Sequence, residues 1–389
     1  MENAGRTARS NRLSQLTHVD ATTSMGRLLR QFWQPVALSA SIANGSARPL
    51  EILGENLTLF RGASGTAYLI GGTCAHRCTV LHTGWVEGDQ LRCMYHGWRY
   101  DGTGTCTEMP AERVTPSAVT IASYPVHEYC GLLFAYMGSA PAPAFDLPRK
   151  AAFEIPDHLV IAREQVWDCN WFQQVENSLD SVHVSFVHQW GQLGRFGSEV
   201  TTALPELHFE ETASGIRQTA IRGKDNVRIS DWTFPNNNHI VSAAFAAKGE
   251  PWVHTGVWAV PIDNARTARF TIVSVTPGTK SAELALDDPN AGFNPADHYD
   301  DLFNAHRIPE QGRGTGLGQS QDYVALRGQG SVADREHEHL AASDAGIALL
   351  RRICFREMGA LANGAEPKRW QRHDVPSELP QPGQLTAVE

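Results

Sequence analysis

The chain has 389 residues, of which 42% are hydrophobic and 19% are charged, and its formal net charge is −9. This composition supports a large buried core and excludes a disordered chain. Acidic and basic residues are mixed along the sequence, which argues against a nucleic-acid partner because phosphate binding needs a basic face. The length favours two domains.

The sequence also carries no sign of export or membrane insertion. Residues 1–20 are polar and lack the apolar segment of a signal peptide. No run of about 18 apolar residues could cross a bilayer, so we expect a soluble, cytoplasmic protein without a membrane partner. The seven cysteines are scattered and odd in number, which is a poor basis for disulfides and favours metal binding by a clustered subset.

The expected elements follow a strands-plus-helices order, typical of an α+β fold. Residues 25–36 predict a short helix that leads into an extended segment, and residues 50–138 predict a small antiparallel β domain. The Pro-rich stretch 140–148 marks a boundary, giving domains 1–150 and 151–389. Residues 166–188 read as a helix, 207–276 as strands, 277–319 as mostly loop, and 320–361 as ending in a long amphipathic helix.

Four metal-ligand residues stand in the first domain. Cys74-x-His76 and Cys93-x-x-His96 are separated by 16 residues. Each pair supplies one thiolate and one imidazole, and two histidines on one iron raise the potential of a [2Fe–2S] cluster. A zinc site is the alternative, but zinc pairs are usually two to four residues apart, which disfavours Cys-x-His.

This stretch resembles the Rieske domain of the ring-hydroxylating oxygenases. One departure is Cys78, which stands where that class more often has a small residue. No matching cysteine lies between Cys93 and His96, so we expect Cys78 to be a free, packed thiol.

A second candidate site is the Asp180-x-x-His183-x4-His188 pattern. Two histidines and a carboxylate on one face of iron(II) leave open positions for O₂ and substrate. A spacing of five rotates the second histidine by about 140° on an α-helix. We therefore expect a π-bulge or a helix end between the two histidines.

The third ligand is expected to be a distant carboxylate, with Asp322, Asp334 and Asp344 as candidates. Resemblance to the phthalate-dioxygenase-like branch of the same family favours Asp322. It implies that Asp180 is not a ligand but holds His183 and carries electrons across a subunit boundary. Asp334 and Asp344 would then cap or pair locally, Asp334 with Arg335.

The resemblance extends over nearly the whole chain, and it implies more than the ligands. The second domain would be a helix-grip (START-like) catalytic domain with an antiparallel sheet and a long C-terminal helix. The cofactors would be a Rieske [2Fe–2S] cluster and a mononuclear Fe(II). The assembly would be a homotrimer in which one chain's cluster serves a neighbour's iron.

No nucleotide-binding motif accompanies these sites. Gly312, Gly314, Gly316 and Gly318 imitate a phosphate loop but do not follow a strand, so we interpret them as a loop over the active site. Electrons would therefore come from a separate NAD(P)H-dependent reductase, with or without a ferredoxin.

The substrate is less well defined by sequence. The phthalate-type relatives often act on aromatic carboxylates, and a carboxylate favours an arginine in the pocket. Of Arg217, Arg222 and Arg228 we select Arg222 as the anchor. The segment from Asn236 to His239 is also expected near the pocket, with Asn236 as a contact, and apolar walls would come from Phe186, Val187, Trp190 and Trp258.

We therefore predict a terminal oxygenase component that uses O₂ to dihydroxylate the ring of a small aromatic carboxylate. The alternative is a Rieske monooxygenase that performs O-demethylation or C–H hydroxylation. Two rival classes are a Rieske electron carrier, which would leave the second site idle, and a zinc-stabilised binding protein.

Overall fold

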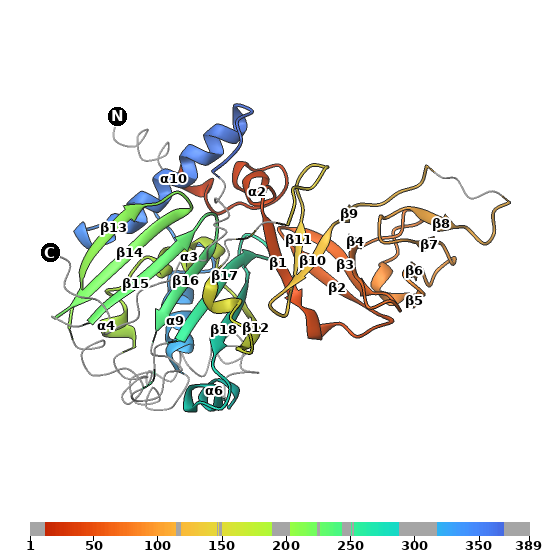
Figure 1. The fold of residues 1–389 in the computed structure, drawn as a ribbon. Helices are drawn as coiled ribbons and strands as arrows, with labels where there is room; N and C mark the ends of the chain where they lie inside the picture. The colour runs from red at the N-terminus through yellow and green to blue at the C-terminus, as the bar shows by residue number, and fades with distance from the viewer. Residues whose placement is uncertain are drawn as a thin grey trace, which may run out of the picture.

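The computed structural model describes residues 12–113, 118–145, 147, 150–188, 203–223, 226–242, 250, 253–287 and 317–368. Within them the chain forms four antiparallel sheets and several helices, which confirms the expected α+β class. Figure 1 shows the small sheets at one end of the molecule and the large sheet with its helices at the other.

The first part of the chain builds three small sheets, as the alternating pattern predicted. They are β1-β11-β10, β2-β3-β4-β9 and β5-β6-β7-β8. Their strands are β1 (Trp33–Leu38), β2 (Ser46–Ile52), β3 (Glu55–Arg61), β4 (Ala67–Gly71), β5 (Trp85–Glu87), β6 (Gln90–Arg92), β7 (Arg99–Tyr100), β8 (Cys106–Glu108), β9 (Ser123–Tyr124), β10 (Val126–Tyr129) and β11 (Leu132–Tyr136).

The second part is built on one seven-stranded sheet. Its order is β12-β18-β17-β16-β15-β14-β13, and every neighbouring pair is antiparallel. The strands are β12 (Leu159–Trp167), β13 (Glu206–Glu211), β14 (Gly215–Arg222), β15 (Asn226–Thr233), β16 (Asn237–Ser242), β17 (Val253–Pro261) and β18 (Thr267–Val275).

The helices of this part are α3 (Trp171–Ser178), α4 (Val184–Val187), α6 (Lys280–Leu286), α9 (Leu317–Gly328) and α10 (Ala345–Ala362). The long helix α10 runs along the sheet near β13 and β14, and α3 lies against β16 and β17 (Figure 1). We call the face of the sheet that these helices cover the inner face. This arrangement agrees with the expected helix-grip domain.

The opposite, outer face of the large sheet packs against the N-terminal part. Strand β1 contacts β12 and β17, and the backbone N–H groups of Leu53 and Gly54 donate to the carbonyls of Pro261 and Ile262 at 2.8 and 2.7 Å. One hydrophobic core therefore runs through both parts, from the short helix α2 (Ser24–Leu29) to α10.

Two element predictions were wrong in part. The expected helix at 166–188 begins late, because β12 continues to Trp167, and it is broken between Ser178 and Val184. Asn170 caps α3 by accepting from the Phe172 N–H at 3.0 Å, which fixes the helix start. The stretch expected to be loop after Pro277 contains α6, and α9 precedes the predicted C-terminal helix.

Among the described residues, no helix is both long and apolar enough to span a membrane.

Candidate metal centres

The two Cys/His pairs lie on loops that share one hydrogen-bond pattern. The Cys74 N–H donates to the Thr79 carbonyl at 2.9 Å, and the Cys93 N–H donates to the Trp98 carbonyl at 2.8 Å. Four residues after each cysteine, an N–H closes back onto that cysteine's carbonyl, from Cys78 at 2.9 Å and from Gly97 at 3.1 Å. The two loops are therefore structural equivalents.

This equivalence explains the unusual residue Cys78. Both Cys78 and Gly97 have positive φ, 57° and 73°, in the left-handed region that glycine tolerates best. Cys78 occupies the position that glycine fills in the other loop. Its thiol is free, as expected, but it is exposed, so the prediction that it is packed was wrong.

The side chains at these loops suit a [2Fe–2S] cluster with mixed ligands. Cys74 and Cys93 are 2% and 1% exposed, and the Cys93 sulfur accepts from the backbone N–H groups of Tyr95 and His96. His76 and His96 are exposed, with ring centroids 4.5 Å apart. The site thus combines two buried thiols with two imidazoles at the surface, which is the donor set that a Rieske cluster requires.

One buried phenol also reaches this site. The Tyr100 hydroxyl accepts from the Ala75 N–H at 3.0 Å and lies 3.2 Å from the Cys74 sulfur. Since the amide uses an oxygen lone pair, the phenol proton is free to be donated to the sulfur. Sequence reasoning missed Tyr100, although its place four residues after His96 was visible.

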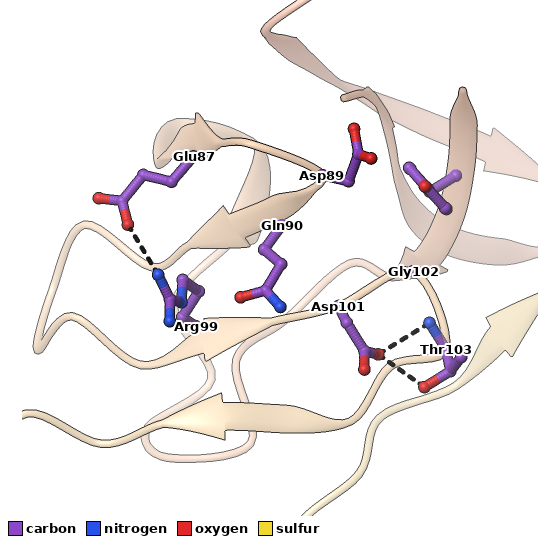
Figure 2. Close-up of a pocket in the computed structure, with 8 residues that line it drawn as sticks. Glu87, Asp89, Gln90, Arg99, Asp101, Gly102 and Thr103 are labelled. Carbon is purple, nitrogen blue, oxygen red and sulfur yellow. Dashed lines mark hydrogen bonds and ion pairs between the residues drawn. The ribbon is translucent and has the colours of Figure 1, made fainter. Parts of the chain in front are cut away.

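A polar groove of about 650 Å³ lies on the β5–β8 sheet (Figure 2). Its charged groups bind one another or nearby protein groups, although Arg99 Nε has no hydrogen-bond partner among the described residues. Glu87 pairs with Arg92 and Arg99, and Asp101 accepts from the N–H and hydroxyl of Thr103 at 2.9 and 2.6 Å. The groove is therefore explained by local structure.

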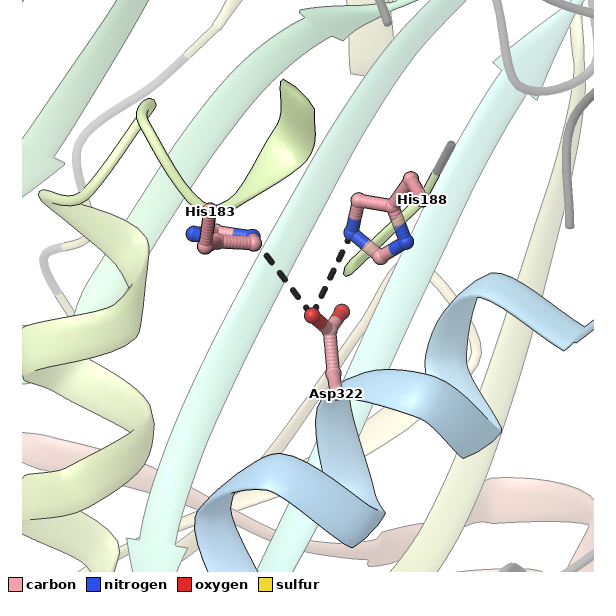
Figure 3. Close-up of side chains that lie close together, drawn as sticks. All are labelled: His183, His188 and Asp322. Carbon is pink, nitrogen blue, oxygen red and sulfur yellow. Dashed lines mark ion pairs between the residues drawn. The ribbon is translucent and has the colours of Figure 1, made fainter. Parts of the chain in front are cut away.

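The second site brings together residues that are far apart in the sequence. His183 lies at the start of α4, His188 at its end, and Asp322 on α9 (Figure 3). Asp322 Oδ1 is 3.5 Å from His183 Nε2 and 3.2 Å from His188 Nε2. These three form a group whose ligand atoms all lie within 4.8 Å of one another.

The contacts of this triad favour a metal ion. Asp322 Oδ1 is buried and has no hydrogen-bond partner, although it faces both histidines. Burial alone would raise the pKa of Asp322, but His188, His183 and Arg269 lower it to about 2. An orphaned carboxylate oxygen between two imidazole nitrogens fits the 2-His-1-carboxylate geometry of non-haem iron.

Asp180 stands behind His183. Its Oδ2 is 3.6 Å from His183 Nδ1, the ring nitrogen that faces away from Asp322. Its Oδ1 accepts from the backbone N–H groups of Val182 and His183 at 2.8 and 3.2 Å. Burial would raise the pKa of Asp180, but these hydrogen bonds and the neighbouring imidazole lower it. Asp180 is placed to orient His183.

The other local predictions had mixed outcomes. The short helix α4 ends at Val187, between the two histidines, with His188 as its C-cap, which confirms the expected helix end. Asp334 and Asp344 do bind locally, to the N–H groups of Glu336 and Ala341. Asp334 does not pair with Arg335, however, because Arg335 binds Glu176 at 2.6 Å.

The predicted substrate contacts bind protein groups, although Arg222 Nη1 is buried without a partner among the described residues. Arg222 is 1% exposed and donates through Nε and Nη2 to the carbonyls of Ala203 and Ser181, at 3.1 and 2.7 Å. The Asn236 amide donates to Gln34 and Ala259 at 2.8 and 2.9 Å.

The predicted apolar wall residues are also dispersed. Trp258 is buried on the outer face against Phe134, while Phe186 is 62% exposed. Trp190, Gly312, Gly314 and Gly316 lie outside the described residues, and Gly318 belongs to α9.

A small β domain with a Cys₂His₂ loop pair, joined to a helix-covered antiparallel sheet with a two-histidine carboxylate triad, defines a class of iron-dependent oxygenase. Comparison with known proteins agrees. Residues 32–125 match the model of the Rieske [2Fe-2S] domain.

Two curated relatives resemble the chain over most of its length. The 5,5'-dehydrodivanillate O-demethylase oxygenase subunit of Sphingobium sp. (strain NBRC 103272 / SYK-6) is 32% identical over 91% of this chain and 81% of that protein. The phenoxybenzoate dioxygenase subunit alpha of Ectopseudomonas oleovorans is 32% identical over 91% and 86%.

Solved structures share the fold at lower identity. Pseudomonas putida CBB5 NdmA has a TM-score of 0.67 and 19% identity, covering 86% of this chain and 92% of that one. The terminal oxygenase of carbazole 1,9a-dioxygenase from Novosphingobium sp. KA1 has a TM-score of 0.63 and 20% identity, covering 90% and 96%.

The chain belongs to the Rieske non-haem iron oxygenases and is an oxygenase (alpha) component. Its cofactors are a Rieske [2Fe–2S] cluster and a mononuclear iron. Oxygenase components of this kind work with a separate reductase or ferredoxin.

Proposed function

We propose that this chain is the terminal oxygenase for a small aromatic carboxylate, with ring dihydroxylation as the outcome. The observation that carries the proposal is the meeting of His183, His188 and Asp322 on the inner face of the large sheet. We also place the domain boundary near residue 150, so that 1–150 binds the cluster and 151–389 binds the iron.

The proposed ligand roles follow from the donor atoms. Cys74 and Cys93 bind one iron of the cluster and His76 and His96 bind the other, while His183, His188 and Asp322 bind the mononuclear iron. When bound, the cluster supplies single electrons and the mononuclear iron supplies open positions for O₂ and substrate.

Asp180 has the role of an electron bridge. Its carboxylate lies 3.6 Å from His183 Nδ1, while Nε2 is directed at Asp322. The same carboxylate borders a surface pocket of about 470 Å³ that also includes Asn177 and Arg335. Asp180 is therefore open to a neighbouring molecule as well as to its own histidine.

The partner that we propose for this pocket is the cluster loop of a second chain in a homotrimer. His76 and His96 are exposed, and Met94 and Tyr95 beside them are 55% and 52% exposed. In Figure 1 the β5–β8 sheet lies at the opposite end of the chain from α4. Electron transfer from the cluster of one chain to the iron of a neighbouring chain would therefore cover a shorter distance than transfer within one chain. A separate NAD(P)H-dependent reductase, with or without a ferredoxin, would supply the electrons.

The substrate class rests on the relatives. Three relatives are named for aromatic acids: the phenoxybenzoate dioxygenase, the phthalate 4,5-dioxygenase of Pseudomonas putida and the 3-chlorobenzoate-3,4-dioxygenase of Comamonas testosteroni. The O-demethylase acting on 5,5'-dehydrodivanillate supports the alternative, in which this chain removes a methyl group from an aryl ether. Product analysis by mass spectrometry distinguishes a diol from a phenol plus formaldehyde.

The ligand assignment is tested by His183→Ala in the reconstituted enzyme. We expect turnover of aromatic acids to fall by at least about a hundredfold, while the Rieske electron paramagnetic resonance signal is unchanged. Turnover that survives would show that the mononuclear site is misassigned. Absence of the Rieske signal from the wild type would overturn the cluster assignment instead.

The bridge is tested separately by Asp180→Asn. The amide keeps the size of the side chain but cannot hold the imidazole as a carboxylate does. We expect both metals to remain bound while single-turnover electron transfer slows by about 10–100-fold. An unchanged rate of electron transfer would contradict the role of Asp180 as an electron bridge.

A further inference from the structure

Three arginines of β14 and β15 were candidates for a substrate contact, and their surroundings differ. Arg217 is on the outer face, where it makes two parallel hydrogen bonds to Asp231 at 2.8 and 3.0 Å. Arg222 ties β14 to the segment before His183 through the carbonyls of Ser181 and Ala203. Both guanidinium groups therefore bind protein groups and have a structural role.

Arg228 has no such role. Among the residues that the structure describes, it makes no hydrogen bond or ion pair, and its Nε is buried without a partner. Burial and the charge of Arg222 lower the pKa of Arg228 to about 10, with Asp322 acting in the opposite direction. The side chain is partly buried, and a buried guanidinium nitrogen without a partner among the described residues is costly, so such a group is normally paired.

The register places Arg228 on the catalytic face. Arg228 lies opposite Ala220 in the β14–β15 ladder, and Gln218 lies opposite Ser230 two residues along. Gln218 accepts a hydrogen bond from the Ser181 hydroxyl. The face of the sheet that carries Gln218 therefore lies against the segment that precedes His183. Cross-strand partners share a face, which puts Arg228 on the inner face with the iron triad.

We propose that Arg228 is the residue that binds the substrate's carboxylate. Its planar guanidinium offers paired donors that match a carboxylate, and the bound anion would supply the missing counter-charge. This inference rests on the proposed function and moves the predicted anchor from Arg222 to Arg228. Substrates would be selected by a carboxylate held beside the iron site.

The test compares binding by the iron-loaded protein of 3-chlorobenzoate and of its neutral amide, by isothermal titration calorimetry. For Arg228→Gln we expect acid binding to weaken about 10–100-fold and amide binding to change less than about threefold. Acid binding by Arg228→Lys should be intermediate, because lysine keeps the positive charge but lacks the paired donors of the guanidinium group. The matched control is Arg217→Gln on the outer face, which should leave acid binding unchanged.

Thermal stability separates this role from a structural one. Removing a partly buried charge that has no ion pair among the described residues should leave the melting temperature of ligand-free Arg228→Gln equal to or above that of the wild type. The acid should raise the melting temperature of the wild type but not of the variant. A lower melting temperature without ligand, or equal acid binding by variant and wild type, would overturn the proposal.

The outcomes also separate this inference from the proposed function. If the wild type neither binds nor oxidises any aromatic acid, the proposed substrate class fails. If the wild type oxidises 3-chlorobenzoate and Arg228→Gln does so with unchanged KM, only the role of Arg228 fails.

Discussion

At the scale of single residues, the Tyr100 hydroxyl lies against a cluster ligand. Its proton is directed at the Cys74 sulfur because the Ala75 amide occupies the oxygen. A hydrogen bond to a thiolate is stronger in the reduced, more negative state of a cluster. Tyr100→Phe should therefore lower the reduction potential.

We expect a shift in the reduction equilibrium of up to about tenfold, or about 59 mV for one electron. Spectroelectrochemical titration of the holoprotein measures it. The control is Tyr124→Phe, which removes a phenol that donates to Glu55 at 2.6 Å instead. Equal potentials in wild type and Tyr100→Phe would count against this contact.

A second residue-scale feature is the imidazole pair on the outer face. His254 Nδ1 is 3.1 Å from Nε2 of the buried His239. Burial, followed by the charges of His158 and Lys150, lowers the pKa of His254 to about 4. The unfolded chain therefore takes up a proton at a higher pH than the folded chain, and stability falls as pH drops from about 6.5 to about 4.

Between about pH 7 and pH 5 this group should cost about 2 kcal/mol of unfolding free energy. Thermal unfolding at both pH values should show a smaller loss for His254→Gln than for the wild type. His208→Gln, at an exposed site on β13, is the control. An identical loss of stability in all three proteins would show that His254 does not cause this pH dependence.

Single residues also show where sequence reasoning stops. The Cys and His positions could be predicted because their spacing alone is characteristic of the chemistry. The proposal of Arg228 in place of Arg222 could not be reached from sequence, since it depends on which carbonyls accept hydrogen bonds from each guanidinium. Cys78 likewise has a left-handed backbone conformation and an exposed thiol, and its sequence neighbours reveal neither.

At the scale of elements, α3 is joined to α10 by buried charges. Glu176 on α3 binds Arg335 and Arg351 through separate oxygens, each at 2.6 Å. All three side chains are 12% exposed or less. This network fixes α3, which leads to Asp180 and His183, against the C-terminal helix.

Glu176→Gln should leave two buried guanidinium groups without a full counter-charge. We expect a loss of about 3–5 kcal/mol of stability, visible as a lower melting temperature. Glu283→Gln breaks an exposed pair with Lys280 on α6 and should cost less than about 1 kcal/mol. Similar small losses for both variants would mean that the network does not hold α3.

The element errors have a physical origin. Periodicity predicted a helix over 166–188 because β12, α3 and α4 are all apolar on one side. The strand extends to Trp167 because it pairs with Thr267 on β18, a contact 100 residues away along the chain. Asp322 was reached only through family resemblance, since no local spacing connects α9 with α4.

At the scale of the whole molecule, the two centres belong to opposite ends of one chain (Figure 1). The cluster histidines are exposed at one end, and Asp180 borders a pocket at the other. The fold class could be predicted from sequence because strand and helix patterns are regular. The assembly could not, because a single sequence does not specify which surfaces meet.

The central claim is that electrons pass between chains. Two variants test it when assembled together: His96→Ala, which lacks a working cluster, and His183→Ala, which lacks the mononuclear iron. Each alone should be inactive. In mixed assemblies, verified by native mass spectrometry, an intact cluster of one chain lies beside an intact iron site of another, so we predict recovered turnover of an aromatic acid. Mixed assemblies that stay as inactive as the separate variants would contradict transfer between chains.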